Sequence, residues 1–333
     1  MKNILNVGLI GAGRIGKVHA QNIDLHPELN LHSISDAFES NAKALAKEYS
    51  AAVISIDTIF ENSEIDLLII ASPTNTHANF IELASENNKP VLCEKPIDND
   101  SIRAQQCIDK LKAYNNCCGL AFNRRHDPLF QQLKDNLINN KIGDLEMLII
   151  TSRDPAPPPI DYIKTSGGLF KDMSIHDFDI ARWLLDEPII ELHATGSNLV
   201  DSAIGEAGDI DSAIINLKTE SGKLCQINNS RRAVYGYDQR IEALGSKGML
   251  TADNIRESQL LTATQSGSEQ QPLLDFFLER YEQAYKNELQ DFLDSVKENR
   301  QPLASPTDGL MALKLAEAAQ ESLNSGNVIS LYC

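Results

Sequence analysis

Apolar and polar residues alternate along the first third of the chain in the rhythm of a strand–helix repeat. Short apolar runs typical of buried strands occur at 4–10, 31–36, 66–71, 90–93 and 117–121. Amphipathic segments typical of helices separate them, one running to about residue 24 and others covering 41–49, 76–87 and 101–113. Because helical crossovers join parallel strands, this order predicts an α/β fold with a doubly wound parallel sheet and helices on both faces.

The rhythm changes after about residue 122. A helix at 128–139 and a strand at 144–152 precede a proline-rich loop, 154–159, and then a helix that ends near Leu185. Strand-like segments follow at 189–200, 209–218, 223–230, 238–245 and 248–252, with a hairpin turn at 220–223, and helices at 275–298 and 307–325 close the chain. We therefore predict a first domain of residues 1–122 and a second α/β domain, 123–333, with a large mainly antiparallel sheet.

A glycine-rich turn joins the first predicted strand to the first helix. Residues 11–16, Gly-Ala-Gly-Arg-Ile-Gly, match G-x-G-x-x-G in the strand–helix context that a Rossmann dinucleotide site requires. Gly11 permits a tight turn, Gly13 lets the backbone approach a pyrophosphate, and Gly16 lets the helix pack on the strand. We predict that these glycines, with Arg14 and Ile15, bind a dinucleotide at the helix N-terminus. An ordinary strand–helix turn is the alternative.

Asp36 ends the second predicted strand, twenty residues after Gly16. A carboxylate there accepts hydrogen bonds from the adenosine ribose and repels a 2′-phosphate. Ala37 and Phe38 follow it rather than a basic residue. The sequence therefore favours NAD over NADP, and a solvated Asp at a strand end is the alternative.

Polar residues also follow the apolar run at 66–71, at the carboxyl edge of the sheet, where doubly wound folds bind ligands. We expect Ser72, Thr74 and His77 to border the nicotinamide ribose of the cofactor. A capping role for Thr74 has equal weight.

Glu94-Lys95-Pro96 follows the strand at 90–93, again at the carboxyl edge. We predict that Glu94 and Lys95 lie at the cofactor and that Lys95 donates to a substrate hydroxyl. A solvent-facing lysine is the alternative. The peptide bond before Pro96 is a candidate for the cis form.

Asp172 and His176 are four residues apart in a segment predicted to be helical, so they share a helix face. There the carboxylate would orient the imidazole and tune its basicity, which suits a base that removes a hydroxyl proton. The alternative is a first-turn Asp beside a packed histidine. Together with a dinucleotide that carries a hydride, such a base indicates an alcohol dehydrogenase.

Size and charge narrow the class of protein. The chain has 333 residues, 42% of them hydrophobic, which is enough for two domains with a core. Its net charge of −17 leaves no basic surface for phosphates, so we expect no nucleic-acid partner. No apolar run reaches the roughly 20 residues that span a bilayer, and the N-terminus lacks a signal-peptide core, so we expect no membrane partner.

Cysteines and histidines give no metal pattern. The 6 cysteines are scattered without a C-x-x-C pair, and the 7 histidines do not cluster. We expect reduced thiols, a cytoplasmic location and no bound metal.

Three motifs, taken in this order, resemble the Gfo/Idh/MocA oxidoreductase family: residues 11–16, Cys93-Glu94-Lys95-Pro96 and residues 167–179. Segments 123–128, 152–158 and 229–240 resemble the inositol-oxidising members of that family, and the resemblance covers nearly the whole chain. Position 126 departs from it, being histidine where relatives usually carry tyrosine or phenylalanine.

The resemblance implies a catalytic set of Lys95, Asp172 and His176. In this set His176 takes the proton of the substrate hydroxyl, Asp172 orients the imidazole, and Lys95 hydrogen-bonds the reacting oxygen. The hydride leaves the same carbon for C4 of the nicotinamide.

The matching motifs also contain polar residues placed to bind the hydroxyls of a cyclic polyol. The candidates are Arg125, Asp154 and Tyr235. Structural roles are nearly as well supported: Arg125 pairing with Asp127, and Tyr235 packing in the sheet.

The resemblance implies NAD-dependent oxidation of myo-inositol to 2-keto-myo-inositol (scyllo-inosose). It also implies a homo-oligomer, commonly a tetramer, that assembles through the open face of the sheet. Two alternatives stay open: a dehydrogenase for another cyclic polyol or sugar, and a non-catalytic NAD-binding sensor. A sensor is expected to lack a complete Lys/Asp/His set, which this chain has.

Overall fold

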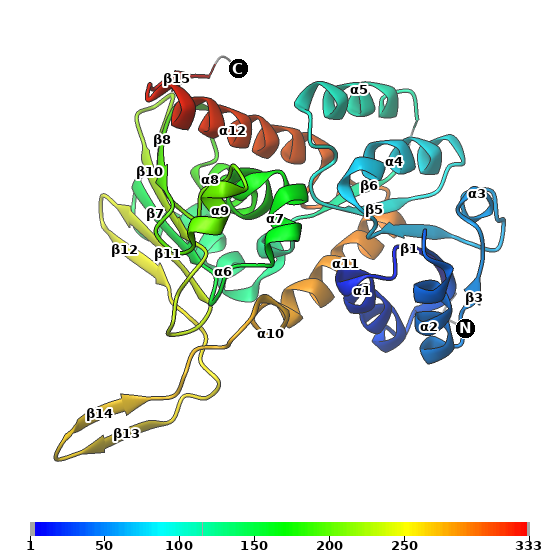
Figure 1. The fold of residues 1–333 in the computed structure, drawn as a ribbon, viewed down its shortest axis with the longest axis horizontal. Helices are drawn as coiled ribbons and strands as arrows, with labels where there is room; N and C mark the ends of the chain where they lie inside the picture. Colours follow the sequence, from blue (N-terminus) through cyan, green and yellow to red (C-terminus); the bar gives the residue numbers. More distant parts are fainter. Residues whose placement is uncertain (1–3, 115, 332–333) are drawn as a thin grey trace. The chain divides into compact units, whose positions relative to one another are not determined.

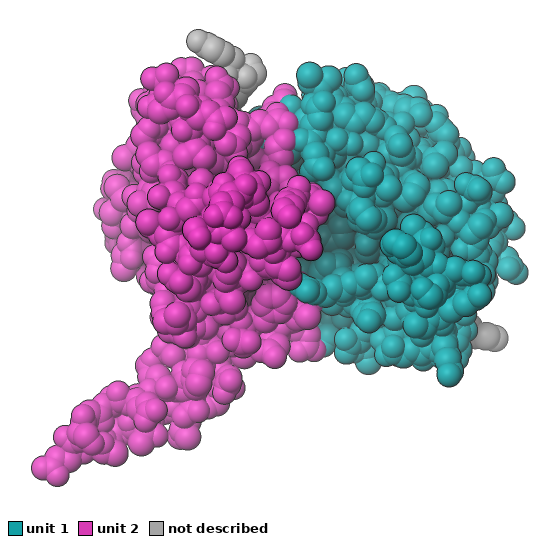
Figure 2. Space-filling model, in the orientation of Figure 1, with its two compact units in different colours: residues 1–126, 284–313 teal, residues 127–283, 314–333 magenta. Residues whose placement is uncertain are grey.

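The structure is a computed structural model that describes residues 4–114 and 116–331. The chain forms two compact units, which Figure 2 colours separately. Residues 1–126 and 284–313 make the first unit, and residues 127–283 and 314–333 make the second. The chain therefore leaves the first unit near the predicted domain boundary. It returns to the first unit for residues 284–313.

A six-stranded parallel sheet forms the centre of the first unit, in the order β3-β2-β1-β4-β5-β6. Its strands are β1 (Leu5–Ile10), β2 (Leu29–Ser35), β3 (Ala52–Val53), β4 (Leu67–Ile70), β5 (Val91–Glu94) and β6 (Cys118–Ala121). The strands are apolar because helices cover both faces of a parallel sheet, and all of β4 is buried. The strand order reverses between β1 and β4, which is where doubly wound folds bind ligands.

Helices cover both faces of this sheet (Figure 1). The helices and 3₁₀ turns of this unit are α1 (Arg14–Leu25), α2 (Glu39–Tyr49), α3 (Ile56–Ile59), η1 (Thr74–Thr76), α4 (His77–Glu86), α5 (Ser101–Leu111), η2 (Asn123–His126) and α11 (Glu282–Glu298), which belongs to it from residue 284 onward. The face that carries α1 and α2 also receives α11, since Leu289, Phe292 and Leu293 belong to the core cluster formed there by β1, α1 and α2. The predicted doubly wound sheet is confirmed.

The second unit contains a seven-stranded mixed sheet, in the order β12-β11-β7-β10-β9-β8-β15. Its strands are β7 (Leu145–Arg153), β8 (Ile189–Ser197), β9 (Ser212–Thr219), β10 (Leu224–Ser230), β11 (Asp238–Gly245), β12 (Gly248–Ala252) and β15 (Ile329–Ser330). Only β7 and β10 are a parallel pair within this sheet as described, and the other neighbours run antiparallel. The prediction of a large, mainly antiparallel sheet is confirmed.

Helices of the second unit lie on one face of this sheet (Figure 1). They are α6 (Pro128–Ile138), α7 (Ile160–Ser166), a π-helical turn (Phe170–Ser174), α8 (Ile175–Leu185), α9 (Ser202–Glu206), α10 (Phe277–Arg280) and α12 (Pro306–Ser325), whose end belongs to this unit. Strand side chains alternate accordingly: Ala213, Ile215 and Leu217 of β9 are buried, whereas Ile214 between them is exposed. We call the face with the exposed side chains the open face.

The sequence pattern misses several short elements. Helices α7 and α9 each cover at most two turns, too short for a periodic apolar stripe. A hairpin of β13 (Leu261–Thr264) and β14 (Gly267–Gln270) has every residue exposed, so it lacks the alternation that predicts strands. The prediction of a single helix at 275–298 is wrong, because this segment forms two helices, α10 and α11.

Candidate active site

The glycine-rich turn between β1 and α1 has the geometry that a dinucleotide needs. Gly11 has a φ of +103°, and a Cβ at Gly11 or at Gly16 would collide with backbone oxygen atoms. A Cβ at Gly13, in contrast, would meet no described atom within 4 Å. The turn is therefore closely packed at its two ends and open at its middle glycine, where the pyrophosphate approaches in this fold.

The N-terminus of α1 is available to an anion. Gly13 is the N-cap residue, no side chain caps the helix, and its first turn contains no acidic residue. The first N–H groups of a helix have no partner within it, and the helix dipole adds positive charge at that end. The residues present thus fit the phosphates of a dinucleotide.

Asp36 follows β2 and lies beside this turn. Its Oδ2 accepts a hydrogen bond from the backbone N of Ala12 at 2.7 Å, and its Oδ1 accepts one from the backbone N of Phe38 at 2.8 Å. These bonds fix the carboxylate at the edge of the glycine turn, where the fold places the adenosine ribose.

His77 joins two loops at the carboxyl edge of the parallel sheet. Its buried ring has Nδ1 2.7 Å from the oxygen of Pro96 and Nε2 2.8 Å from the oxygen of Ser72. Burial lowers the pKa of His77, against the opposing effect of these two bonds. The imidazole thus contacts the chain rather than facing solvent, and it holds the loop after β4 against the loop after β5. The Lys95–Pro96 bond in the second loop is cis, as considered from the sequence.

The other polar residues of the loop after β4 contact one another. Ser72 Oγ lies 2.6 Å from Thr76 Oγ1. Thr74 begins the 3₁₀ turn η1, and the N-cap residue of α4 is Thr76, so Thr74 does not cap that helix. A cofactor role for Ser72 and Thr74 stays a prediction.

Glu94 at the end of β5 is bound to the helix that follows the glycine turn. Its Oε1 lies 2.8 Å from Nε2 of His19, a fully buried residue of α1. Lys95 is the next residue and is partly exposed. The His19–Glu94 contact therefore joins α1 to the strand end that carries the predicted catalytic lysine.

In the second unit, Asp172 and His176 lie on one continuous helical segment. Gly167 and Gly168 precede it with φ of +86° each, and Asp172 falls in the π-helical turn, while His176 falls in the first turn of α8. The predicted end of this helix near Leu185 is confirmed. Single π-turns inside helices frequently occur at functional sites.

Asp172 has two partners that are not predicted from the sequence. Both terminal nitrogens of Arg231 lie 3.3 Å from Asp172 Oδ2, and the hydroxyl of Tyr162 donates to Asp172 Oδ1 at 2.8 Å. Arg231 directly follows β10 inside a motif noted in the sequence, next to the equally basic Arg232. Only the fold shows which arginine points to the carboxylate. Tyr162 lies on α7 and carries no sequence signal.

A second buried network anchors the start of α8 to β10. Asn229 donates to Asp177 Oδ2 at 2.8 Å and accepts from Ser174 Oγ at 2.6 Å. All three residues are buried. His176 lies between Ser174 and Asp177 in sequence, so its backbone is held by residues on both sides.

Arg125, a candidate for the substrate, lies in the first unit and is buried. Its guanidinium donates to the Leu303 oxygen at 2.9 Å and pairs with Asp308 at 3.1 Å. Asp127, which the sequence suggests as a partner of Arg125, caps α6 and binds Arg280. Burial raises the pKa of Asp308, but Arg125 and Ser305 outweigh it, so the pKa is lowered overall.

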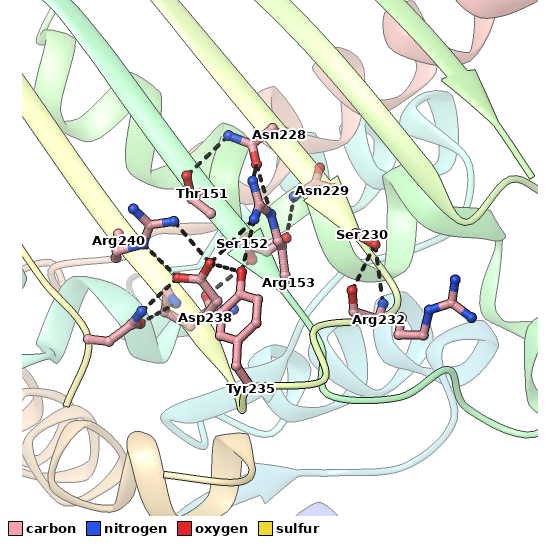
Figure 3. A network of polar contacts seen from close by, with 12 residues as sticks. Thr151, Ser152, Arg153, Asn228, Asn229, Ser230, Arg232, Tyr235, Asp238 and Arg240 are labelled. Atoms are coloured by element: carbon pink, nitrogen blue, oxygen red, sulfur yellow. Dashed lines mark hydrogen bonds and ion pairs between the residues drawn. The ribbon is translucent and has the colours of Figure 1, made fainter. Parts of the chain in front are cut away.

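Asp154 and Tyr235 lie in the second unit and have different surroundings. Asp154 directly follows β7, and its backbone N donates to the Ser230 oxygen at 2.9 Å. The Tyr235 hydroxyl donates to Asp238 Oδ2 at 2.7 Å and accepts from Arg153 at 2.9 Å. Figure 3 shows this network in front of the sheet, with helices behind. The structure thus places the Tyr235 hydroxyl between Asp238 and Arg153 on the open face.

Cysteine, metal and membrane features add little. The cysteines that the structure describes are free, Cys333 lies outside the described residues, and burial raises the pKa of Cys107 to about 12. Within residues 4–114 and 116–331, no three His, Cys, Asp or Glu side chains form a group able to hold a metal ion. No helix in the same ranges is long and apolar enough to cross a membrane.

Two family models match the chain. One, described as "Oxidoreductase family, NAD-binding Rossmann fold", matches residues 5–122, and the other, "Oxidoreductase family, C-terminal alpha/beta domain", matches residues 134–331. The inositol 2-dehydrogenase of Rhizobium meliloti is 46% identical over 324 residues, which cover 97% of this chain and 98% of that protein.

Solved structures are similar over the whole chain. A myo-inositol dehydrogenase from Corynebacterium glutamicum superposes with a TM-score of 0.95 and 44% identity, covering 99% of each chain. A scyllo-inositol dehydrogenase from Lactobacillus casei, with bound NAD(H) and scyllo-inositol, gives a TM-score of 0.92 at 29% identity, covering 98% of this chain and 99% of that chain.

Proposed function

Because the chain belongs to the Gfo/Idh/MocA oxidoreductase family, we propose that it oxidises myo-inositol to 2-keto-myo-inositol (scyllo-inosose) with NAD. The observation that carries this substrate is the 46% identity to an inositol 2-dehydrogenase over 97% of the chain. The uncapped helix N-terminus and the open glycine turn support NAD as the cofactor.

We propose the following roles at the reacting carbon. Bound NAD supplies the hydride acceptor. His176 takes the proton of the substrate hydroxyl, and Asp172 orients its imidazole and stabilises the imidazolium that forms. Lys95 hydrogen-bonds the reacting oxygen. Proton transfer of this kind contributes about 10²–10⁴-fold to the rate.

Two side chains keep Asp172 in place for that role. Arg231 and Tyr162 bind the two oxygens of the Asp172 carboxylate separately, which restricts its rotation. Arg125, Asp154 and Tyr235 remain the predicted ring-binding residues. Asp154 is a partly exposed carboxylate at the carboxyl end of β7, which suits a contact with a ring hydroxyl.

Incubation of the purified protein with NAD and myo-inositol tests the proposal. We expect NADH absorbance to increase with time and to depend on both reagents. Absence of turnover with every inositol isomer, while aldoses are oxidised, would favour a sugar dehydrogenase. NAD binding without turnover on a broad polyol panel would favour the sensor.

We further propose that the protein is a homotetramer that assembles through the open face. Leu244 pairs with Met249 on one side and with Met147 on the other, and Met147 pairs with Leu224. These four side chains are between 38% and 53% exposed, and they form an apolar row across four strands. Contiguous apolar rows on a surface mark association sites. Light scattering should show a smaller particle for Met147→Glu than for wild type.

We also propose that the protein is cytoplasmic. The described cysteines are free thiols, most of them buried, which suits a reducing compartment. Fractionation of cells that express the tagged protein checks this location.

A further inference from the structure

Glu288 is a buried acid that the proposed reaction does not use. It lies on α11 within the first unit, with 1% of its surface exposed. Neither of its carboxyl oxygens has a hydrogen-bond partner among the residues that the structure describes. An ionised carboxylate without a donor is strongly disfavoured in such a place. The geometry therefore indicates a neutral acid.

Glu288 lies one turn along α11 from a residue that contacts His19 of the His19–Glu94 pair. Tyr285, one turn earlier on α11, meets the His19 ring edge-on, with 6.3 Å between the ring centroids. The negative groups that act on Glu288 are Glu94, at the end of β5, and Asp291, on its own helix. Burial first, and then these two carboxyl groups, raise the pKa of Glu288 well above its usual value. Neighbouring carboxyl groups resist ionising together, so the buried one keeps its proton.

The His19–Glu94 pair connects two parts of the predicted cofactor site. His19 belongs to α1, the helix whose N-terminus follows the glycine turn, and Glu94 precedes Lys95. We propose that Glu288 is a positioning residue of the cofactor site and acts as a neutral acid near this pair. The proposal rests on the proposed function only in taking NAD as the ligand.

Loss of the proton from Glu288 has a defined consequence. Its charge would repel the Glu94 carboxylate, which holds the imidazole of His19. The contact that holds α1 to the end of β5 would then weaken, and NAD affinity would fall with it.

Calorimetric titration of the full-length protein with NAD tests this from neutral pH up to the most alkaline pH at which the protein stays folded. Wild-type affinity should fall at alkaline pH by up to about tenfold per pH unit above the pKa of Glu288. Glu288→Gln cannot ionise, so its affinity should stay level over the same range. Glu288→Ala should bind NAD less tightly at every pH, and the comparison with Gln then shows rescue by the isosteric side chain. Glu298→Gln, an exposed change on the same helix, should follow wild type.

Unfolding in urea gives a second measurement. A group whose pKa is raised by folding contributes stability that is fully present below its unfolded pKa and is lost as the pH rises through its folded pKa. Wild type should therefore lose stability relative to Glu288→Gln as the pH rises. Parallel NAD-affinity curves for these two proteins would overturn the proposal even if their urea curves differ, because Glu288 would then have only a structural role. Weak NAD binding by Glu288→Gln at neutral pH would also overturn it, because the charged form would then be required.

Glu94→Gln covers the case in which Glu288→Gln does not fold. The alkaline loss of NAD affinity should disappear in this variant, because the carboxylate that Glu288 repels is gone, and its persistence would count against the proposal. None of these measurements uses inositol. A wrong substrate assignment would therefore leave this test intact.

Discussion

Arg231 places both of its terminal nitrogens 3.3 Å from one oxygen of Asp172, with only 1% of its own side chain exposed. A second carboxylate, Asp209, lies 3.7 Å from the same guanidinium. The predicted catalytic aspartate is therefore held by a buried cation as well as by the hydroxyl of Tyr162. This contact connects the end of β10 to the helical segment that carries His176.

Replacement of Arg231 by Met should impair both folding and catalysis. It leaves Asp172 and Asp209 without their shared cation, and breaking a buried pair in this way costs about 3 kcal/mol. We expect a lower urea midpoint and a kcat reduced more than the KM for the polyol is raised. Arg232→Met is the control, since Arg232 is exposed and donates to backbone oxygens. A wild-type rate in Arg231→Met would remove Arg231 from any role at the site.

His176→Ala should lower kcat by about 10²–10⁴-fold, because no other group is proposed to take the hydroxyl proton. NAD affinity should stay close to wild type, since the glycine turn belongs to the first unit. Steady-state kinetics with a separate NAD titration makes the distinction. His32→Ala removes an imidazole from β2 and serves as the control. A near-normal rate in His176→Ala would contradict the proposed role.

Asp36→Ser should shift cofactor preference toward NADP. The change removes the negative charge that repels a 2′-phosphate, and it also removes the acceptor of the bonds from Ala12 and Phe38. We expect kcat/KM for NAD to fall and the NADP to NAD ratio to rise by about tenfold or more, which corresponds to 1.4 kcal/mol. Asp24→Ser, the same change near the end of α1, should leave the ratio as in wild type.

Gly13→Ala and Gly16→Ala should separate cofactor binding from folding. Gly13 has ordinary backbone angles and open space at its Cβ, so alanine should cost less than about 1 kcal/mol of stability. Its methyl group should nevertheless raise the Kd for NAD, by about tenfold or more. Gly16→Ala meets the Gly11 oxygen and should destabilise the fold by about 1–3 kcal/mol. Thermal melts and NAD titrations of both variants check the contrast, which fails if Gly13→Ala binds NAD normally.

Asp238→Asn should weaken the bonds that Arg240, Asn254 and Tyr235 make to residue 238, and the loss of stability should depend on pH. Burial raises the pKa of Asp238, but bonds from Arg240, Asn254 and Tyr235 outweigh it, so the pKa is lowered overall. A lowered pKa contributes stability above the unfolded pKa that is lost as the pH falls through the folded value.

We expect Asp238→Asn to lose about 2 kcal/mol at neutral pH. The difference from wild type should shrink below about pH 4. Urea unfolding at several pH values measures it, with Glu242→Gln on the same strand as control. A difference that stays constant with pH would show that charge does not contribute.

The sequence predicts those parts of the fold that local pattern determines. The all-buried strand β4 is an apolar run, and α1 begins at Arg14, within the glycine motif. The local sequence therefore predicts both elements without information about what packs against them. The hairpin β13–β14 is not, because its exposed residues carry no apolar alternation. Long-range packing is also invisible: nothing local indicates that Phe292 joins the core built from β1 and α1.

The residues of the candidate site also fall into two groups, those that the local sequence predicts and those that only the fold brings together. The spacing of Asp172 and His176 is local, and their shared helical segment follows from it. Arg231 and Tyr162 reach Asp172 only through the fold. Arg125 is a further example, because its buried guanidinium binds Asp308 from a distant segment and nothing local indicates that contact.

The return of residues 284–313 to the first unit has a consequence for biosynthesis. Leu289, Phe292 and Leu293 complete a core whose other members lie in the first 121 residues. A ribosome will therefore have translated the entire intervening polypeptide before that core can close. Until then the nascent N-terminal portion exposes an apolar surface, and a truncated gene ending at residue 122 should give an aggregation-prone product rather than an autonomous domain.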